Sequence, residues 1–244
     1  MNIFSKKICV ILPHLDDEFA IAPLIKKLVK FNDFKVIFCT ERRQTPLINQ
    51  NRRRKESESS LNYLGIKYKD IFYLNDHFLV DDMTIHLSKA IIYDYLSKMN
   101  NFFKFDIIFT LNLEGGHPDH DSLSLLVNKF SEKEKIKAYY FPAYNSRRNL
   151  IIFPFSILRP LQSQEYFFQK EIIKPFCWMD SVIVAFNYVS EWKAMIKIIP
   201  FIILKILTSN FIFFTEKIEF ESINWDKSLT CSRYKVAPDL ILFK

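Results

Sequence analysis

Glycine is scarce in this chain of 244 residues, which contains only three. Flexible glycine-rich linkers are therefore excluded, and the sequence shows neither an internal repeat nor a low-complexity tract. Apolar residues make up 49% of the chain and charged residues 25%, as in an ordinary globular protein. One domain with a C-terminal elaboration fits this length better than two domains.

Cysteine is also sparse, because the four cysteines are widely separated and form no CxxC pair. This pattern argues against a structural zinc knuckle and against a redox pair. Cys9 and Cys39 lie in apolar runs, where a thiol behaves as a small hydrophobic side chain. We expect a protein of a reducing compartment, the cytoplasm.

Long hydrophobic runs are missing as well. The apolar run near the N-terminus ends at Pro13 after five residues, so we expect no signal peptide there. The longest apolar region, 198–214, is interrupted by Pro200 and Lys205, whereas a spanning helix needs about 20 mostly apolar residues. We interpret this region as a packed helix whose lysines reach solvent, although peripheral contact with the inner face of a membrane stays open.

Long blocks of like charge are missing too, and the nearest to one is NRRRK at 51–55. The net charge is +7 at pH 7, and the basic residues are dispersed rather than interleaved with aromatic ones. We therefore expect no nucleic-acid partner. An anionic small substrate and an anionic lipid surface are both compatible with this charge.

Short β-rich apolar runs alternate with segments of helical period over the first 140 residues or so. This alternation predicts an α/β fold with a mostly parallel sheet and helices on both faces. After Tyr144 the alternation fades, so we predict a catalytic core over 1–144 and, over 145–244, an elaboration or cap that completes the same domain. The predicted strands are 7–12, 34–40, 70–74, 105–111 and 136–143, and the predicted helices are 18–30, 52–64, 82–99 and 122–130.

Polar residues follow the first and the fourth predicted strands. The stretch "ILPHLDDEFA" places His14, Asp16 and Asp17 after the first strand, and "LEGGHPDHDS" places His117 and His120 after the fourth. The carboxyl ends of parallel strands meet at one edge of a sheet, so both stretches point to the same place. Two imidazoles and one carboxylate, with a position left for water, are typical ligands of a hydrolytic zinc centre.

Each stretch alone has a simpler explanation, since aspartate favours the first turn of a helix and a single histidine often has no role. Their occurrence together favours a site. Gly115 and Gly116 are two of the three glycines, and residues without a Cβ atom allow a sharp turn and close backbone approach. Pro118 is expected to stiffen the segment between the two histidines.

The stretches "PHLDDE" and "GGHPDH", in this order, resemble the paired motifs HPDDE and HPDH of the LmbE-like (PIG-L) zinc-dependent N-deacetylases. The stretch "RRKESESSLNYLGI" resembles the R-x-x-E helix of the family, with Arg53 and Glu56 at the matching positions. The resemblance extends over residues 7–142. Leu15 stands where the family usually has proline, and we expect this to change the stiffness of the loop without loss of the metal.

The resemblance implies a Rossmann-like fold and a reaction that removes the N-acetyl group from an amino sugar, carried on a glycolipid, a nucleotide or a polysaccharide precursor, with release of acetate. It also implies the role of each matching residue. His14, Asp17 and His120 would bind Zn²⁺ or another divalent metal, Asp16 would be the general base, His117 would stabilise the oxyanion, Asp119 would orient His117, and Arg53 would contact the substrate.

Two other functions are compatible with parts of these motifs. The dipeptide His120-Asp121 also occurs in HD-type phosphohydrolases, but these need an all-helical scaffold, which the predicted strand 105–111 contradicts. A non-catalytic relative that binds carbohydrate or a lipid surface would be expected to lack a ligand, and none is missing. Arg147 and Arg148 follow the last predicted strand, either as an anion-binding pair or as ordinary surface residues.

Overall fold

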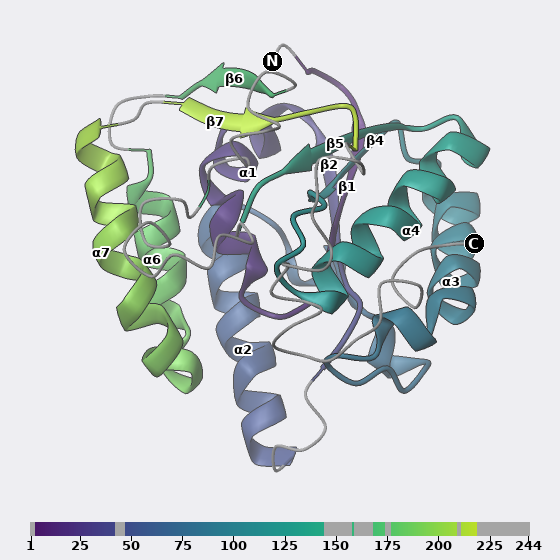
Figure 1. Cartoon of the computed structure of the whole chain (residues 1–244), viewed down its shortest axis with the longest axis horizontal. Coiled ribbons are helices and arrows are strands. Elements are labelled where there is room, and N and C mark those ends of the chain that lie inside the picture. Colours follow the sequence, from purple (N-terminus) through teal and green to yellow (C-terminus); the bar gives the residue numbers. More distant parts are fainter. Residues whose placement is uncertain are drawn as a thin grey trace.

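The computed structural model describes residues 3–41, 47–143, 158, 168–173, 177–208 and 211–218. A five-stranded parallel sheet in the order β3-β2-β1-β4-β5 forms its centre (Figure 1). The α/β class predicted from the sequence is thereby confirmed. The strands are β1 (Lys7–Leu12), β2 (Asp33–Phe38), β3 (Ile71–Tyr73), β4 (Ile107–Leu111) and β5 (Lys137–Phe141).

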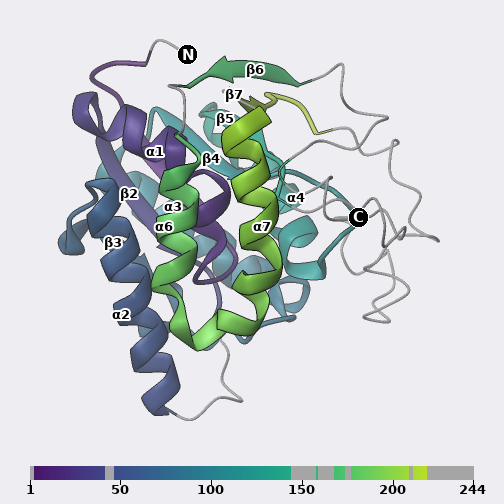
Figure 2. The same ribbon diagram turned by 90° about the vertical axis from the view of Figure 1, so that its left-hand side faces the viewer.

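Helices cover both faces of the sheet, which is why its strands are apolar at nearly every position. In β1, Ile8, Val10 and Leu12 belong to the core on one face, and Cys9 and Ile11 belong to the core on the other. Figures 1 and 2 show the two helical layers. The first contains α1 (Ala22–Leu28), α2 (Leu47–Leu64) and α6 (Met179–Asn187), and the second contains α3 (Lys89–Phe103) and α4 (Pro118–Glu134).

The second half of the chain adds to the same core. Val182, Ala185 and Tyr188 are buried together with side chains of β1, α1 and α2. Helix α7 (Trp192–Thr208) packs on α6, and β6 (Gln169–Ile172) pairs antiparallel with β7 (Phe211–Phe214). The division at residue 144 stays a prediction. In the described part of the chain, no helix has the length and apolarity that a membrane crossing requires.

The helix boundaries differ from the prediction more than the strand boundaries do. The helix predicted over 18–30 consists of a 3₁₀ turn, Asp17–Ala20, followed by α1 and a further 3₁₀ turn, Val29–Phe31. The helix predicted over 82–99 begins only at Lys89, after a turn in which Met83 has φ 69°. The helix predicted over 52–64 begins earlier, at Leu47.

Helix α4 also begins earlier than predicted, at Pro118 rather than Ser122. Proline suits the first position of a helix, because its φ is already helical and the N–H that it lacks has no partner there. This start places His120 and Asp121 in the first turn of α4. The residues of the second motif are therefore held by a helix instead of a loop.

The strand order reverses between β1 and β4. The chain leaves β1 towards α1 on one face and leaves β4 towards α4 on the other. Such a switch point leaves a crevice at the carboxyl ends of the two strands, where ligands bind in open parallel sheets. Both sequence motifs start at this crevice.

Candidate metal centre and active site

The chain turns sharply after β1. Asp16 has φ 107° and ψ −20°, in the left-handed region that residues with a side chain rarely adopt. Two carboxylates hold this turn, since the backbone N–H of His14 donates to Asp17 Oδ2 at 3.0 Å and that of Asp16 donates to Glu18 Oε2 at 3.1 Å. Unfavourable backbone conformations of this kind concentrate at functional sites.

The segment after β4 is held by Asp121. Its fully buried carboxylate accepts hydrogen bonds from the backbone N–H of Glu114 at 2.8 Å and of Gly115 at 3.0 Å. Gly115 has φ 67°, so the freedom of glycine is used at this position, whereas Gly116 has no positive φ. His117 then caps α4, because its Nδ1 accepts a hydrogen bond from the backbone N–H of Asp119 at 3.3 Å.

Replacing Asp121 by alanine is expected to destabilise the protein. The change leaves the N–H groups of Glu114 and Gly115 buried without their acceptor, which costs roughly 2–4 kcal/mol. Urea unfolding of the variant and the wild type measures the difference. Asp94→Asn, on the exposed side of α3, is the control and should leave the midpoint unchanged; an Asp121→Ala variant as stable as the wild type would contradict the structural role.

Three side chains from the two motifs, those of His14, Asp17 and His120, bring their polar atoms close together. His14 Nδ1 lies 3.1 Å from Asp17 Oδ2 and 3.2 Å from His120 Nε2, and His120 Nε2 lies 3.6 Å from Asp17 Oδ1. Ligands at about 2.0–2.2 Å from a tetrahedral zinc ion stand about 3.3–3.6 Å from one another. The three groups therefore have both the chemistry and the spacing of a divalent metal centre.

Asp119 supports this cluster from behind. Its Oδ2 lies 3.0 Å from His14 Nε2, and its carboxylate also accepts hydrogen bonds from the backbone N–H of Met83 at 2.5 Å and of Ile85 at 3.0 Å. A carboxylate on the far nitrogen of a histidine ligand fixes the ring and makes it a stronger ligand. The prediction places Asp119 against His117, and in the structure its carboxylate contacts His14 while its backbone N–H donates to His117.

The surroundings of the cluster shift the pKa values of His14 and His120 in opposite directions. Burial lowers the pKa of His14, but its hydrogen bonds to Asp119 and Asp17 outweigh burial and leave that pKa well above its ordinary value. Burial, together with His117 and His14, lowers the pKa of His120 well below its ordinary value, so this ring is neutral at pH 7. A neutral imidazole beside the Asp17 carboxylate is ready to accept a cation.

Asp16 lies beside the cluster and faces Arg53. Burial raises the pKa of Asp16 well above its ordinary value, although Arg53 opposes this effect. The Arg53 guanidinium lies 3.6 Å from Asp16 Oδ2 and donates to the backbone oxygen of Leu15 at 2.8 Å. Arg53 is thus buried against the turn, and a contact with substrate stays a prediction.

His117 is half-buried and close to both other histidines. Its ring centroid lies 4.8 Å from that of His14 and 4.7 Å from that of His120. One ligand atom from each of the three imidazoles lies within 4.8 Å of the others. Because Nδ1 of His117 accepts the hydrogen bond from Asp119, the neutral ring carries its proton on Nε2 and can donate it to a ligand.

Sequence reasoning missed the residues that support the first turn from a distance. Burial raises the pKa of Glu18 to about 7, and Tyr188, 170 residues further along, donates a hydrogen bond to its Oε1. Glu191 lies 3.5 Å from Arg53 Nε, and Ser190 donates to Glu56 through its N–H at 3.0 Å and through its hydroxyl. In the sequence, only Glu18, the last residue of "PHLDDE", indicated that the first turn has a further polar partner.

Asp82 is a further acidic residue of the site that the sequence did not indicate. It accepts a hydrogen bond from the Thr40 hydroxyl at 2.8 Å. Burial lowers the pKa of His14 and of Arg53, but nearby carboxylates raise both pKa values above their ordinary level, and Asp82 is one of these carboxylates in each case. The turn that contains Asp82 also supplies the N–H of Met83 to Asp119. This turn therefore forms one wall of the site.

Other candidates from the sequence do not join the cluster. His77 is exposed, and its ring lies 5.7 Å from that of Tyr95. Arg147 and Arg148 lie outside the described residues. The alternative of an HD-type phosphohydrolase is wrong, because the scaffold is a parallel sheet and the Asp121 carboxylate holds a backbone loop.

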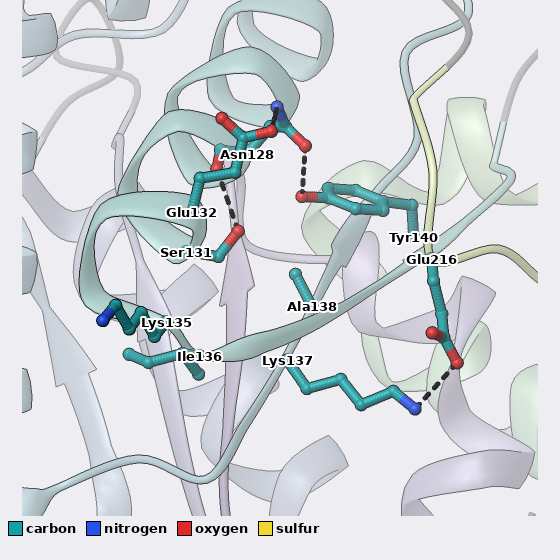
Figure 3. Close-up of a pocket in the computed structure, with 9 residues that line it drawn as sticks. All are labelled: Asn128, Ser131, Glu132, Lys135, Ile136, Lys137, Ala138, Tyr140 and Glu216. Atoms are coloured by element: carbon teal, nitrogen blue, oxygen red, sulfur yellow. Dashed lines mark hydrogen bonds and ion pairs between the residues drawn. The ribbon is translucent and has the colours of Figure 1, made fainter.

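A hollow of about 310 Å³ lies at the opposite end of α4, beside the start of β5 (Figure 3). Several of its polar groups pair with one another, since Tyr140 donates to Asn128 Oδ1 at 3.2 Å and Lys137 lies 2.9 Å from Glu216. It is lined by the end of α4 and the beginning of β5, whereas both motifs lie at the start of α4 and after the ends of β1 and β4. We assign it no role in the chemistry.

The parallel sheet and the histidine–carboxylate cluster at its switch point define the class of protein: an α/β chain with a centre suited to a divalent metal. The model of the PIG-L family, described as GlcNAc-PI de-N-acetylase, matches residues 9–131, which is half of the chain. The chain belongs to this family. No curated protein sequence matches the chain.

Solved structures show the same fold at low sequence identity. The conserved protein TT1542 from Thermus thermophilus is 14% identical, with a TM-score of 0.60 over 86% of this chain and 94% of that one. A deacetylase of the teicoplanin biosynthesis pathway is 13% identical, with a TM-score of 0.55 over 78% and 86%. The 4-carboxy-2-hydroxymuconate hydratase GalB from Pseudomonas putida is 10% identical, with a TM-score of 0.50 over 86% and 94%, so the fold alone does not define the reaction.

Proposed function

We propose that the chain is a metal-dependent hydrolase that removes the N-acetyl group from an amino sugar and releases acetate. One observation carries the proposal: His14 Nδ1 lies 3.1 Å from Asp17 Oδ2 and 3.2 Å from His120 Nε2, and His120 Nε2 lies 3.6 Å from Asp17 Oδ1. The Asp16 carboxyl is close enough to Asp17 and His14 to interact with both electrostatically. Membership of the PIG-L family supports the same reaction.

His14, Asp17 and His120 would hold the metal. Two nitrogen donors and one carboxylate suit zinc, and they leave a coordination position for water. When bound, a divalent cation of this kind polarises a carbonyl and lowers the pKa of water. The carboxylate of Asp119 on His14 Nε2 would raise the affinity of the centre.

Asp16 is the general base in this proposal. It takes a proton from the water that attacks the acetyl carbonyl carbon and later delivers that proton to the sugar nitrogen as the C–N bond breaks. The products are acetate and a free amine, so the water supplies one oxygen and two hydrogens. Burial raises the pKa of Asp16, and a carboxylate with a raised pKa is a stronger base, which suits it to take the proton from water and hold it until the nitrogen departs.

His117 is the oxyanion donor. Negative charge grows on the carbonyl oxygen during the attack, and the Nε2–H of His117 can donate to it from a fixed position at the start of α4. The backbone N–H of Asp119 donates to Nδ1 of His117 and so keeps the proton of that ring on Nε2, while the Asp119 carboxylate orients His14. Asp119 is therefore a positioning residue.

The proposed substrate is an N-acetylhexosamine joined to a lipid, a nucleotide or a further sugar. The family description names an N-acetylglucosamine lipid, which supports this class.

An acetate-release assay on N-acetylglucosamine derivatives, with and without a chelator, tests the proposed reaction. Acetate is expected only from the metal-loaded protein, and activity should return when zinc is added back. A chain that binds about one zinc and releases no acetate from any derivative contradicts the proposal, and so does activity that the chelator leaves unchanged.

A further inference from the structure

Helix α7 presents an apolar stripe to solvent. Trp192, Ile196, Ile203 and Leu207 are 55%, 57%, 44% and 74% exposed. At 3.6 residues per turn these four side chains fall within a sector about 60° wide that extends about 22 Å along the helix. The stripe is defined by these four residues.

The stripe is not the face through which α7 packs, because the opposite side of the helix contacts α6. Met195, Ile198, Ile199 and Ile202 are buried in the core that contains α6. The sequence-based interpretation of this region as a packed helix is therefore correct for one face of α7 and wrong for the other. A helix that is apolar on a solvent-facing side marks an interaction surface.

The charge of α7 indicates what the stripe contacts. Lys193 and Lys197 are exposed on one flank of the stripe, and the helix sequence WKAMIKIIPFIILKILT has no acidic residue. A helix with an apolar face and lysines beside it lies in the interface of an anionic bilayer, where the apolar side chains enter the acyl boundary and the ammonium groups reach the headgroups.

The stripe begins next to the candidate active site. Phe186 and Val189 are 63% and 54% exposed at the corner between α6 and α7, just before Trp192. Glu191, in the same corner, lies 3.5 Å from Arg53, which in turn faces Asp16. Figure 2 shows α6 and α7 side by side on the outside of the molecule.

A second copy of the chain fits this surface less well. A two-fold contact through α7 would bring Lys193 and Lys197 against a helix that likewise lacks acidic residues. Anionic headgroups meet the same lysines with opposite charge. The charge pattern therefore favours lipid over self-association.

We propose that the outer face of α7, together with the α6–α7 corner, docks onto an anionic lipid surface with the helix lying in the plane of the interface. The corner residues Phe186, Val189 and Trp192 would then bring Glu191, and with it Arg53 and the turn after β1, close to the headgroups. This docking is independent of the hydrolysis proposed above, since it concerns where the chain binds and not which bond it cleaves.

Co-sedimentation of the full chain with vesicles tests the docking. Wild type is expected to sediment with phosphatidylcholine vesicles that contain about 30 mol % phosphatidylglycerol and to bind pure phosphatidylcholine more weakly. The double variant Ile196→Glu/Leu207→Glu should reduce binding roughly tenfold or more. The double variant Lys193→Gln/Lys197→Gln, which changes only exposed polar groups, should reduce binding to the anionic vesicles roughly 10- to 30-fold.

Phe102→Glu provides a matched control, because Phe102 is 80% exposed on α3, on the other side of the sheet. This variant should bind vesicles as the wild type does. The proposal is overturned if wild type stays in the supernatant with both vesicles or if both double variants bind as tightly as wild type. It is also overturned if the apolar variant only converts a dimer into a monomer. Acetate release from a water-soluble substrate should be unchanged in every variant, which separates docking from hydrolysis.

Discussion

Replacing Asp16 by asparagine should lower kcat by about 10²–10⁴-fold, the usual contribution of a general base. An amide cannot take the proton from water or return it to the departing nitrogen, whereas every proposed metal ligand remains. Asparagine tolerates the left-handed backbone conformation of this position, so the turn should keep its shape.

Steady-state kinetics and metal analysis of the same preparation measure this effect. The Asp16→Asn variant should bind as much zinc as wild type and lose kcat. Asp94→Asn, on an exposed position of α3, should keep both properties. A variant at Asp16 with full activity would assign the base to another residue, and a variant that has lost its zinc would make Asp16 a ligand.

His120→Ala is expected to abolish metal binding and activity together. The change removes one of three converging donors, and alanine is well accepted in the first turn of α4. Asp119→Asn removes the charged partner of His14 and one of the two acceptors for the backbone N–H groups of Met83 and Ile85. It leaves all three proposed ligands in place and should weaken zinc binding about 10- to 100-fold, so His120→Ala should have the larger effect.

Zinc content after dialysis and a competition titration with a chromophoric chelator rank these variants. His77→Ala is the matched control, because His77 is exposed and stacks near Tyr95, and it should retain about one zinc per chain. If His120→Ala binds zinc as tightly as wild type, His120 is not a ligand. Thermal unfolding without metal should show a folded protein for each variant.

The sequence was sufficient to predict the sheet, because its strands are buried on both faces and their apolar runs are nearly continuous. The first strand, 7–12, was predicted with its observed bounds, and the ends of the others differ by at most two residues. The helix starts were less predictable. Pro118 can stiffen a loop or open a helix, and only the packing of α4 against the sheet distinguishes the two.

The sequence could bring the two motifs together, but it could not orient their side chains. Which imidazole the Asp119 carboxylate reaches depends on the rotation of the first turn of α4 relative to β1. The hydrogen bond from Tyr188 to Glu18 could not be predicted either, because no local sequence pattern relates the two residues. The roles of all the predicted site residues stay predictions, those of the metal ligands His14, Asp17 and His120 included.

The pairing of Tyr188 with Glu18 has a consequence for the order of events during synthesis. Ser181 also donates to the backbone oxygen of Phe19 at 2.7 Å. The turn that contains the first motif is thus stabilised by residues that are synthesised more than 160 residues later. A nascent chain that ends near residue 131 carries both motifs but lacks these two hydrogen bonds and the buried face of α6. The site should therefore become complete only after α6 has left the ribosome, and until then the apolar surfaces of α1 and α2 that α6 covers are exposed to chaperones.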